Sequence, residues 1–398
     1  MDITIHPRKL HGTVPAIPSK SHAHRLLICA ALSDGPVDLI CPVINEDICA
    51  TVTCLNALGA QIQQTNTGYR IIPIGVPPKK AQLHCKESGS TLRFLLPVVG
   101  ALGIDATFLL EGRLPERPLS PLWEELEKHG VNLTKPTKNT IRSQGKLQSD
   151  EYSIDGSVSS QYITGLLFAL AIIGNGSHLT ITGSVESQPY ISLTEQVMRH
   201  FQIDTGNLSF HDCYPFRAVN SIICERDWSN AAFFVGSNAL GNHVSVCGLS
   251  DNSPQGDRAI TILTEQLKKH TDIDGRDIPD LIPILSVIAA ANQGAAFHHI
   301  GRLRFKESDR VAAVAQMLEQ LGAEVRINGD SMYVFPAGFH SCIIDSKNDH
   351  RIAMAAAIAS TCASGPVTIT DAECVKKSYP GFWEDFKKLG GCYEQYIR

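Results

Sequence analysis

The charged run RFKESDR, from Arg304 to Arg310, has residue types and spacing suited to binding a charged ligand. It places three cations and two carboxylates within seven residues, directly before an apolar segment. The apolar residues of that segment recur at helical spacing, which predicts a helix with the charged run at its N-terminus. Backbone N–H groups there attract anions, and Lys306 and Arg310, four residues apart, would share one helical face. The run therefore predicts an anion site; the alternative is a solvated row of salt bridges on a surface helix.

Similar polar clusters precede other apolar segments. In PSKSHAHR, the residues Lys20, Ser21 and Arg25 lie before or within the first turns of a predicted helix that ends at Leu32. In ESGSTLRFLLP, a Gly/Ser/Thr turn leads into a helix with Arg93 one turn in, without the GK[ST] ending of a Walker loop. The remaining clusters are ERP at 116–118, SSQ at 159–161, SQPYIS at 187–192, IPD at 278–280, NDHR at 348–351 and KKSYPGFW from Lys376. The first three of these are each expected to open a helix.

Helix capping is the alternative explanation for each cluster taken alone. Asp280, for example, is either an N-cap or a catalytic base. The whole chain is acidic, however, with 35 Lys and Arg against 40 Asp and Glu and a net charge of -5. Cations gathered at repeated helix starts in an acidic protein predict one anion-binding cleft between two domains, whose closure would exclude water from two phosphorylated or carboxylated substrates.

Length and composition narrow the classes of protein. A chain of 398 residues predicts two domains, and 43% hydrophobic with 19% charged residues is typical of a globular protein. The negative net charge argues against a general nucleic-acid or anionic-membrane binder. The 12 cysteines lack CxxC pairs and metal-ligand spacing, so we expect buried thiols, no disulfides and no metal. No signal segment or sufficiently long apolar stretch is evident, which predicts a cytoplasmic protein without membrane spans.

A sixfold repeat organises the chain. Each repeat has an Ala- and Gly-rich apolar helix, a Gly-containing turn and a short alternating strand. The strands are predicted to begin at Val37, Ala106, His178, His243, Ala296 and Val367. Helices that are apolar nearly all round are buried, so the sheets should lie outside them. The fold class is therefore predicted as α/β, with two inside-out domains of three repeats each. The domains comprise residues 15–225, and 1–14 with 226–398, joined by two hinge strands near 12–18 and 222–228; the N-terminal strand pairs with the second half.

These clusters, in this order, closely resemble the motifs of the 5-enolpyruvylshikimate-3-phosphate synthase family, from Lys9 to the C-terminus. The matching segments are PSKSHAHR, SGSTLR, RPL, SSQ, KESDR, NDHR and the Lys377-Ser-Tyr-Pro stretch. The resemblance implies transfer of the enolpyruvyl group of phosphoenolpyruvate to the 5-hydroxyl of shikimate 3-phosphate, with release of phosphate, in aromatic amino-acid biosynthesis. It also implies that no metal or organic cofactor is needed and that the protein is a monomer. The phosphoenolpyruvate half would be the domain that includes residues 226–398.

The resemblance also implies the site residues. Shikimate 3-phosphate would contact Ser21, Arg25, Ser159, Ser160, Gln161, Ser187, Tyr190, Asp280 and Lys306. Phosphoenolpyruvate would contact Lys20, Gly89, Arg117, Gln161, Arg310, Arg351 and Lys377. Because Gly89 matches the small residue of glyphosate-sensitive members, inhibition competitive with phosphoenolpyruvate is expected. Three departures from the family pattern, Glu87, Phe94 and Arg302, affect the expected phosphate contacts and inhibitor response.

The reaction needs acids and bases on both sides of the substrates. Protonation of the methylene carbon makes C2 cationic, the hydroxyl attacks C2 as a base removes its proton, and the resulting tetrahedral ketal expels phosphate. Our candidates are Glu307 for the methylene proton, Asp280 for the hydroxyl proton and Lys20 for assistance to proton transfer or the departing phosphate. Guanidinium groups at Arg117, Arg310 and Arg351 suit carboxylate and phosphate better than ammonium groups do.

Two other functions are open to this sequence. UDP-N-acetylglucosamine enolpyruvyl transferase shares the architecture and one substrate, but the segment from Gly112 to Pro118 lacks the loop Cys that it uses as an acid. A non-catalytic anion-binding relative is the second alternative. Pure binding would not need the acids Asp280 and Glu307 beside anionic ligands, so an enzyme is predicted.

Overall fold

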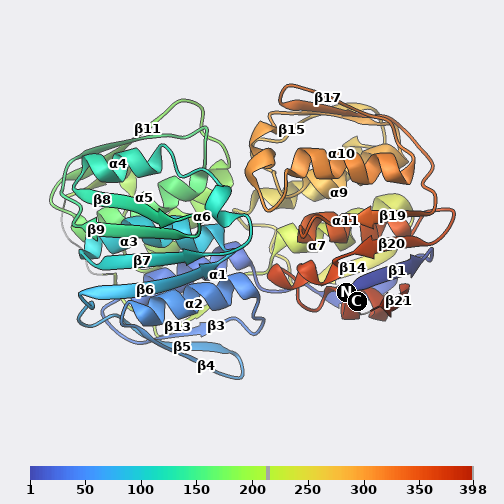
Figure 1. Cartoon of the computed structure of the whole chain (residues 1–398). Coiled ribbons are helices and arrows are strands. Elements are labelled where there is room, and N and C mark those ends of the chain that lie inside the picture. Colours follow the sequence, from blue (N-terminus) through green and yellow to red (C-terminus); the bar gives the residue numbers. More distant parts are fainter. Residues whose placement is uncertain (212–215, 397–398) are drawn as a thin grey trace. The chain divides into compact units, whose positions relative to one another are not determined.

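The computed structural model describes residues 1–211 and 216–396 and has a mixed α/β fold (Figure 1). The chain divides into two compact units: unit 1 is Met1–Ile17 with Arg226–Arg398, and unit 2 is Pro18–Glu225. The chain therefore crosses between the units twice. The crossings fall after Ile17 and after Glu225, inside the predicted segments 12–18 and 222–228, and each lies between a strand and the next helix.

Each predicted strand lies in a different one of the six sheets formed by residues 1–211 and 216–396. These strands are β3 (Val37–Ile40), β7 (Asp105–Leu110), β11 (Ser177–Thr182), β14 (His243–Cys247), β16 (Ala295–His298) and β20 (Val367–Thr370). The predicted apolar helices are α1 (Lys20–Ala31), α3 (Gly89–Leu102), α5 (Ser160–Ile173), α7 (Trp228–Ser237), α9 (Ile282–Ala291) and α11 (His350–Ser360). Most residues in each of these helices are buried, which confirms the predicted class of buried helices and outer sheets.

Unit 2 contains three of the described sheets, each with one parallel pair and one antiparallel pair about a central strand. The strand orders are β13-β3-β5-β4, β6-β7-β9-β8 and β10-β11-β12. The added strands are β4 (Gln61–Gln64), β5 (Gly68–Ile72), β6 (Lys80–Lys86), β8 (Val131–Thr137), β9 (Thr140–Gly145), β10 (Glu151–Asp155), β12 (Ser209–Phe210) and β13 (Ser221–Ile223). Residues 131–145 thus form the antiparallel strand pair of β8 and β9 inside unit 2.

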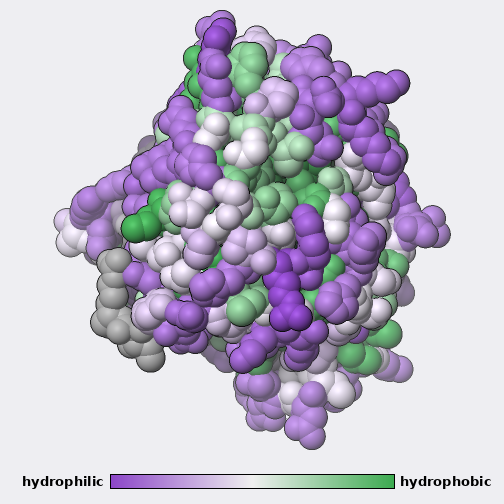
Figure 2. Space-filling model, turned by 90° about the vertical axis from the view of Figure 1, so that its right-hand side faces the viewer, coloured by the Kyte–Doolittle hydropathy of each residue, from purple (hydrophilic) through white to green (hydrophobic). Residues whose placement is uncertain are grey.

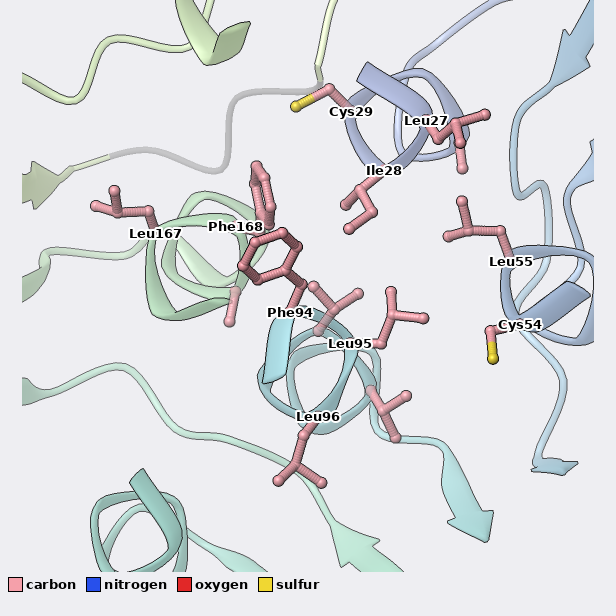
Figure 3. Close-up of a cluster of buried hydrophobic side chains, with 14 of the residues drawn as sticks. Leu27, Ile28, Cys29, Cys54, Leu55, Phe94, Leu95, Leu96, Leu167 and Phe168 are labelled. Atoms are coloured by element: carbon pink, nitrogen blue, oxygen red, sulfur yellow. The ribbon is translucent and has the colours of Figure 1, made fainter. Parts of the chain in front are cut away.

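The core of unit 2 is helical, and Figure 3 shows side chains from its central helices packed together. α1 contributes Ile28, α2 (Glu46–Ala57) contributes Leu55, and α5 contributes Phe168. From α3, the ring of Phe94 packs edge-to-face on Phe168 with centroids 6.0 Å apart. Phe94, one of the departures from the family pattern, is therefore a core residue. The helix α6 (Gln188–His200) packs against α1 and α5.

Unit 1 repeats this design with both ends of the chain. Its sheets have the orders β14-β2, β15-β16-β18-β17 and β19-β20-β1-β21. The added strands are β1 (Asp2–His6), β2 (His11–Pro15), β15 (Thr271–Asp274), β17 (Val325–Asn328), β18 (Ser331–Val334), β19 (Cys342–Asp345) and β21 (Cys392–Tyr396). Ile3 pairs with Ile369, which confirms that the N-terminal strand joins the second half of the chain. Further helices are α8 (Ile260–Gln266), α10 (Arg310–Leu321) and α12 (Phe382–Lys388).

The cysteines are only partly as expected. Each cysteine in the described residues has a free thiol, but Cys247 and Cys392 are exposed because both lie on outer strands. Cys213 lies outside the described residues. Among the described helices, not one has both the length and the apolar composition needed to cross a bilayer. Hydrophilic residues cover most of the face in Figure 2, around a smaller hydrophobic area.

Candidate active site

Arg310 is the centre of a buried charge cluster in unit 1. It is the first residue of α10 and follows the N-cap Asp309, whose side chain accepts the N–H of Ala312. The guanidinium is 1% exposed, and its Nε donates to Asp349 Oδ2 at 3.0 Å. Its Nη1 donates to Asp280 Oδ1 at 2.9 Å and its Nη2 to Glu307 Oε2 at 2.7 Å. One guanidinium therefore holds three carboxylates in a fixed arrangement.

Asp280 connects this cluster to Arg351, which lies in the first turn of α11. Arg351 Nη2 donates to Asp280 Oδ2 at 3.0 Å, and its Nη1 donates to the carbonyl of Ser229 at 2.8 Å. It also hydrogen-bonds to the Ser229 hydroxyl. The N-cap of α9 is Leu281, so Asp280 does not cap that helix. The carboxylate serves instead as a bridge between two guanidinium groups.

Charge pairing dominates the ionisation of these groups. Burial tends to raise the pKa of Asp280, but Arg351, Lys306 and Arg310 outweigh it and hold that pKa far below its usual value. Burial likewise acts to lower the pKa of Arg310, whereas Asp349, Glu307 and Asp280 together raise it. Both groups are therefore charged at neutral pH.

The segment that leads into α10 is not helical at Lys306. This residue has an extended backbone at φ -85° and ψ -158°, directly after a 3-10 turn, Gly301–Phe305. The prediction that Lys306 and Arg310 share a helical face is therefore wrong, because the helix begins only after the Asp309 cap. Burial, opposed by Asp280, lowers the pKa of Lys306 to about 8, so its amine is mostly protonated at pH 7.

Lys377 is the last cation of unit 1 predicted to bind substrate. It ends the 3-10 turn Ala372–Lys377 and is 8% exposed. Its Nζ donates to the carbonyl of Asn348 at 3.0 Å, one residue before the N-cap of α11. The structure thus brings Lys377 to the same helix start as Arg351.

In unit 2, Lys20 and Ser21 are the first two residues of α1, after the N-cap Ser19. Lys20 Nζ pairs with Asp47 Oδ2 at 2.8 Å, and both side chains are 16% exposed. Asp47 lies in the first turn of α2, where a carboxylate is favoured. The ammonium therefore retains access to solvent while an adjacent helix start orients it.

Arg25, predicted to contact shikimate 3-phosphate, is deeply buried. It is 2% exposed, and burial lowers its pKa to about 10. Its donors reach Thr194 Oγ1 at 2.8 Å, the Ser21 carbonyl at 2.7 Å, the Tyr190 carbonyl at 3.0 Å and Thr164 Oγ1 at 3.4 Å. These bonds join α1, α5 and α6, so its main structural effect is to hold Ser21 and Tyr190 together.

Gly89 opens α3 against two guanidinium groups. A Cβ on Gly89 would lie 2.8 Å from Arg117 Nη1 and 3.1 Å from Arg93 Nη1. Arg93 donates to Gln161 Oε1 at 2.7 Å, and Gln161 Nε2 donates to Ser90 Oγ at 2.9 Å. Arg117 follows the 3-10 turn Leu114–Glu116, and α4 begins only at Leu122. The expectation that ERP opens a helix is therefore wrong, but Arg117 still reaches the helix start at Gly89.

The predicted serines lie at two other helix starts of unit 2. Ser159 is the N-cap of α5, where its hydroxyl accepts the N–H of Gln161 at 3.3 Å, and Ser160 is the first helical residue. Ser187 precedes α6 with φ 56° and ψ 42°, a left-handed conformation that costs a non-glycine residue about 1–2 kcal/mol. Its side chain does not cap the helix. Tyr190 lies one turn further along α6.

Three residues of these clusters were not predicted as site residues: Asp349, Ser229 and Asp47. Asp349 caps α11 through the N–H of Arg351 and also accepts Ser308 Oγ at 2.9 Å. The N-cap position in NDHR signalled a polar role, but not the pairing with Arg310. Asp47 and Ser229 lie far in sequence from the cations that they contact, so only the folded chain reveals them.

Two departures from the family pattern have local contacts. A Cβ on Gly112 would lie 2.7 Å from Glu87 Oε1, so the Glu87 side chain fills the space beside that turn. Arg302 donates to the backbone carbonyl of Arg276. Each unit thus carries its own set of cations, and unit 1 adds the carboxylates that acid–base chemistry requires.

Two buried histidines in α1 make the stability of unit 2 pH-dependent. Burial, with the charge of Arg25, lowers the pKa of His22 from 6.5 to about 3, and burial lowers that of His24 well below 6.5. Both rings are neutral in the native protein, whereas the unfolded chain binds protons below pH 6.5. Their contribution is therefore complete above pH 6.5 and is lost as pH falls towards the native pKa values.

We expect the free energy of unfolding to fall by about 1.4 kcal/mol per histidine between pH 7.5 and pH 5.5. Urea unfolding at the two pH values measures the change. The His22→Gln and His24→Asn variants should each reduce the pH-dependent difference by about half of the two-histidine total. An identical difference in parent and double variant would contradict this assignment.

The chain is similar to known proteins over nearly its whole length. The model of the EPSP synthase family, described as 3-phosphoshikimate 1-carboxyvinyltransferase, matches residues 5–386. A 3-phosphoshikimate 1-carboxyvinyltransferase of Clostridium kluyveri is 37% identical over 98% of this chain and 97% of its own. A protein of the same name from Clostridioides difficile is 35% identical, covering 99% of this chain and 98% of its own.

Two solved structures share the fold. An EPSP synthase from Acinetobacter baumannii has a TM-score of 0.80 at 23% identity, covering 99% of this chain and all of its own. The enolpyruvyl transferase NikO from Streptomyces tendae has a TM-score of 0.76 at 16% identity, covering 100% and 99% of the two chains. At these identities the likeness concerns the fold, so the acceptor must be argued from the sequence relatives and the site.

Proposed function

Since this chain belongs to the EPSP synthase family and is a transferase of the shikimate pathway, we propose that its reaction is divided between the two charge clusters described above. The guanidinium groups and carboxylates of unit 1 would supply the acid–base chemistry. The helix starts of unit 2 would hold the acceptor and part of the donor. That both clusters serve one pair of substrates stays a prediction.

Phosphoenolpyruvate is assigned to cations from both units. Arg310, Arg351 and Lys377 of unit 1 would bind its carboxylate and phosphate together with Arg117 and Lys20 of unit 2. Gly89 would let the ligand approach the N-terminus of α3, where backbone N–H groups favour an anion. The fork geometry of the guanidinium groups suits both acidic groups of this substrate.

Shikimate 3-phosphate is assigned to the serines at the starts of α5 and α6. Ser159, Ser160 and Ser187 would bind its phosphate, with Lys306 as the nearby cation. Ser21, Tyr190 and Asp280 would contact the ring, and Gln161 would lie between the two ligands. Arg25 acts on this site mainly by holding Ser21 and Tyr190, because four of its hydrogen bonds go to protein acceptors.

The proposed chemistry proceeds through addition and elimination. Glu307 gives a proton to the methylene carbon of phosphoenolpyruvate, and the 5-hydroxyl of the acceptor forms a bond to C2 while Asp280 takes its proton. The tetrahedral ketal then loses a methyl proton to Glu307 and expels phosphate, with Lys20 beside the leaving group. The double bond is restored, Glu307 regains the proton that it gave, and the proton that Asp280 took from the hydroxyl leaves with the phosphate as hydrogen phosphate.

The observation that supports this proposal best is the bridge formed by Arg310 and its three carboxylates. A purely binding protein would gain nothing from such acids beside anionic ligands. The test is phosphate release from phosphoenolpyruvate with shikimate 3-phosphate or UDP-N-acetylglucosamine as acceptor. We expect turnover with the first acceptor alone, in agreement with the named relatives. Turnover only with the nucleotide sugar, or with neither, would overturn the proposal.

Gly89→Ala tests the phosphoenolpyruvate assignment. The added methyl group would lie 2.8 Å from Arg117 Nη1 and displace that guanidinium. We expect KM for phosphoenolpyruvate to rise roughly tenfold and competitive inhibition by glyphosate to weaken by at least as much, the effect of about 1.4 kcal/mol. KM for shikimate 3-phosphate should change little. Gly338→Ala is the matched control, because its Cβ would meet nothing within 4 Å.

The assembly and cellular location are also proposals. We infer that the protein works in the cytoplasm, since the thiols of the described cysteines are free and such thiols persist in reducing compartments. We also propose a monomer that needs no cofactor, as the family resemblance implies. Light scattering at micromolar concentration tests the oligomeric state. Full activity after extensive dialysis against a chelator tests the independence from metal.

A further inference from the structure

A buried chain of hydrogen bonds leads from the middle of α1 to the start of α3. His24 Nδ1 lies 2.7 Å from Thr51 Oγ1 of α2, and Thr51 Oγ1 lies 2.7 Å from Thr91 Oγ1 of α3. Thr91 Oγ1 donates to Ser88 Oγ at 2.7 Å. His24, Thr51 and Thr91 are fully buried, and Ser88, the N-cap of α3, is 1% exposed. We call these four residues the α3 relay.

The direction of the α3 relay follows from the second nitrogen of His24. This Nε2 is buried and has no hydrogen-bond partner. The ring is neutral, because burial and the nearby Lys20 and Arg25 hold its pKa well below 6.5. A buried N–H without an acceptor costs more than an unused lone pair on an aromatic nitrogen, so the proton belongs on Nδ1. His24 Nδ1–H then donates to the Thr51 hydroxyl, that hydroxyl donates to Thr91, and the Thr91 hydroxyl donates to Ser88.

Capping of α3 does not account for the whole relay. Ser88 Oγ already accepts the backbone N–H of Thr91 at 3.3 Å, which completes an ordinary N-cap. The hydroxyl of Thr51 and the imidazole of His24 add two buried polar groups that aliphatic side chains would replace without a desolvation cost. These two groups fix the positions of α1, α2 and α3 relative to one another, because their hydrogen bonds join the three helices.

Gly89 is the residue whose position the α3 relay fixes. It directly follows Ser88, and its missing side chain faces Arg117 Nη1 and Arg93 Nη1 at 2.8 and 3.1 Å from an ideal Cβ. The next residue, Ser90, accepts a hydrogen bond from Gln161. A small shift of the first turn of α3 would therefore alter the approach of the backbone to both guanidinium groups.

We infer that His24, Thr51 and Thr91 are positioning residues that set the fit of phosphoenolpyruvate between Gly89 and Arg117. This inference rests on the proposed function. These three side chains are remote from the reacting atoms. They would affect the binding of phosphoenolpyruvate but not that of shikimate 3-phosphate.

Isosteric substitutions test the inference by interrupting the relay at one residue. Thr51→Val keeps the shape of the side chain and removes the hydroxyl. Because the Thr51 hydroxyl makes two hydrogen bonds of the relay, we expect KM for phosphoenolpyruvate to rise about five- to tenfold. KM for shikimate 3-phosphate should stay within about twofold of the parent. Thr91→Val should raise KM for phosphoenolpyruvate by a similar factor. The double variant should lose no more affinity for phosphoenolpyruvate than the stronger single variant, because both substitutions interrupt the same row of hydrogen bonds.

Two further variants control the test. Thr53 lies on the same helix as Thr51, but its exposed hydroxyl bonds only to the carbonyl of Cys49. Thr53→Val should therefore leave both KM values at the parent level. His24→Asn offers an amide N–H in place of the imidazole N–H and should retain most of the affinity, whereas His24→Leu should match Thr51→Val. Thermal midpoints of all variants reveal any loss of stability.

The outcomes separate this inference from the proposed function. Equal changes in both KM values, or a lower thermal midpoint with unchanged KM values, would mean that the relay only stabilises unit 2 and would overturn the inference. Unchanged constants in Thr51→Val would do the same. A parent protein that releases no phosphate with shikimate 3-phosphate would instead overturn the proposed function itself.

Discussion

Arg310→Leu is expected to abolish most activity and to destabilise unit 1. The substitution leaves Asp280, Glu307 and Asp349 without the cation that they share, and Asp349 is completely buried. Removal of one partner from a buried ion pair costs about 3–5 kcal/mol. The loss of a guanidinium that balances substrate charge should lower kcat/KM by roughly 10²–10³-fold or more. Urea unfolding and phosphate release measure the two effects.

Two variants make this result specific. Arg310→Lys keeps the charge but cannot reach three carboxylates, so its stability and activity should lie between those of the parent and Arg310→Leu. Arg326→Leu removes a cation that pairs with Glu324 on the surface and is 69% exposed. A surface pair contributes about 0–1 kcal/mol, so this control should keep full activity. Equal losses in Arg310→Leu and Arg326→Leu would contradict the importance of the buried cluster.

Glu307→Gln is expected to lower kcat by roughly 10²–10⁴-fold with little change in either KM, the usual range for loss of a general acid–base group. The amide can still accept a hydrogen bond from Arg310 but cannot exchange a proton with the methylene carbon. Deuterium incorporation into phosphoenolpyruvate during turnover in heavy water should fall in parallel.

Asp280→Asn separates the two acid–base roles. We expect a comparable loss of kcat, together with weaker binding, because Arg310 and Arg351 both lose their shared carboxylate. Glu319→Gln, an exposed substitution on the same helix as Arg310, is the control and should match the parent. If Glu307→Gln retained full activity or full deuterium incorporation, its assignment to proton transfer would be wrong.

The fold could be predicted in large part from the sequence because its main signals are local. Apolar Ala-rich helices, each followed by a glycine turn and a short strand, recur six times, and each such strand lies in a separate sheet of the described residues. The outer hairpins were missed. β4 and β8 present polar residues at most positions, since only one side of each strand is buried, so they lack a strong alternating pattern.

Local patterns in the sequence indicated where the cations lie along the chain but not which side chains they contact. The cations at 20, 310, 351 and 377 do lie at or beside helix starts. Their anionic partners Asp47 and Asp349 depend on contacts between separate helices, which no local pattern encodes. The predicted pairing of Lys306 with Arg310 on one face failed because Asp309 caps the helix and fixes its first residue.

The pairing of β1 with β20 and β21 has a consequence for how the chain assembles during synthesis. Residues at the start of the polypeptide find their strand partners more than 360 positions later, as in the pair Ile3 and Ile369. Unit 2 is one uninterrupted segment and needs no such partner. On the ribosome, unit 2 is therefore fully synthesised before β1 has a strand to pair with. Contacts so distant in sequence favour a slow final folding step, and until that step the apolar side of β1 lacks its strand partners.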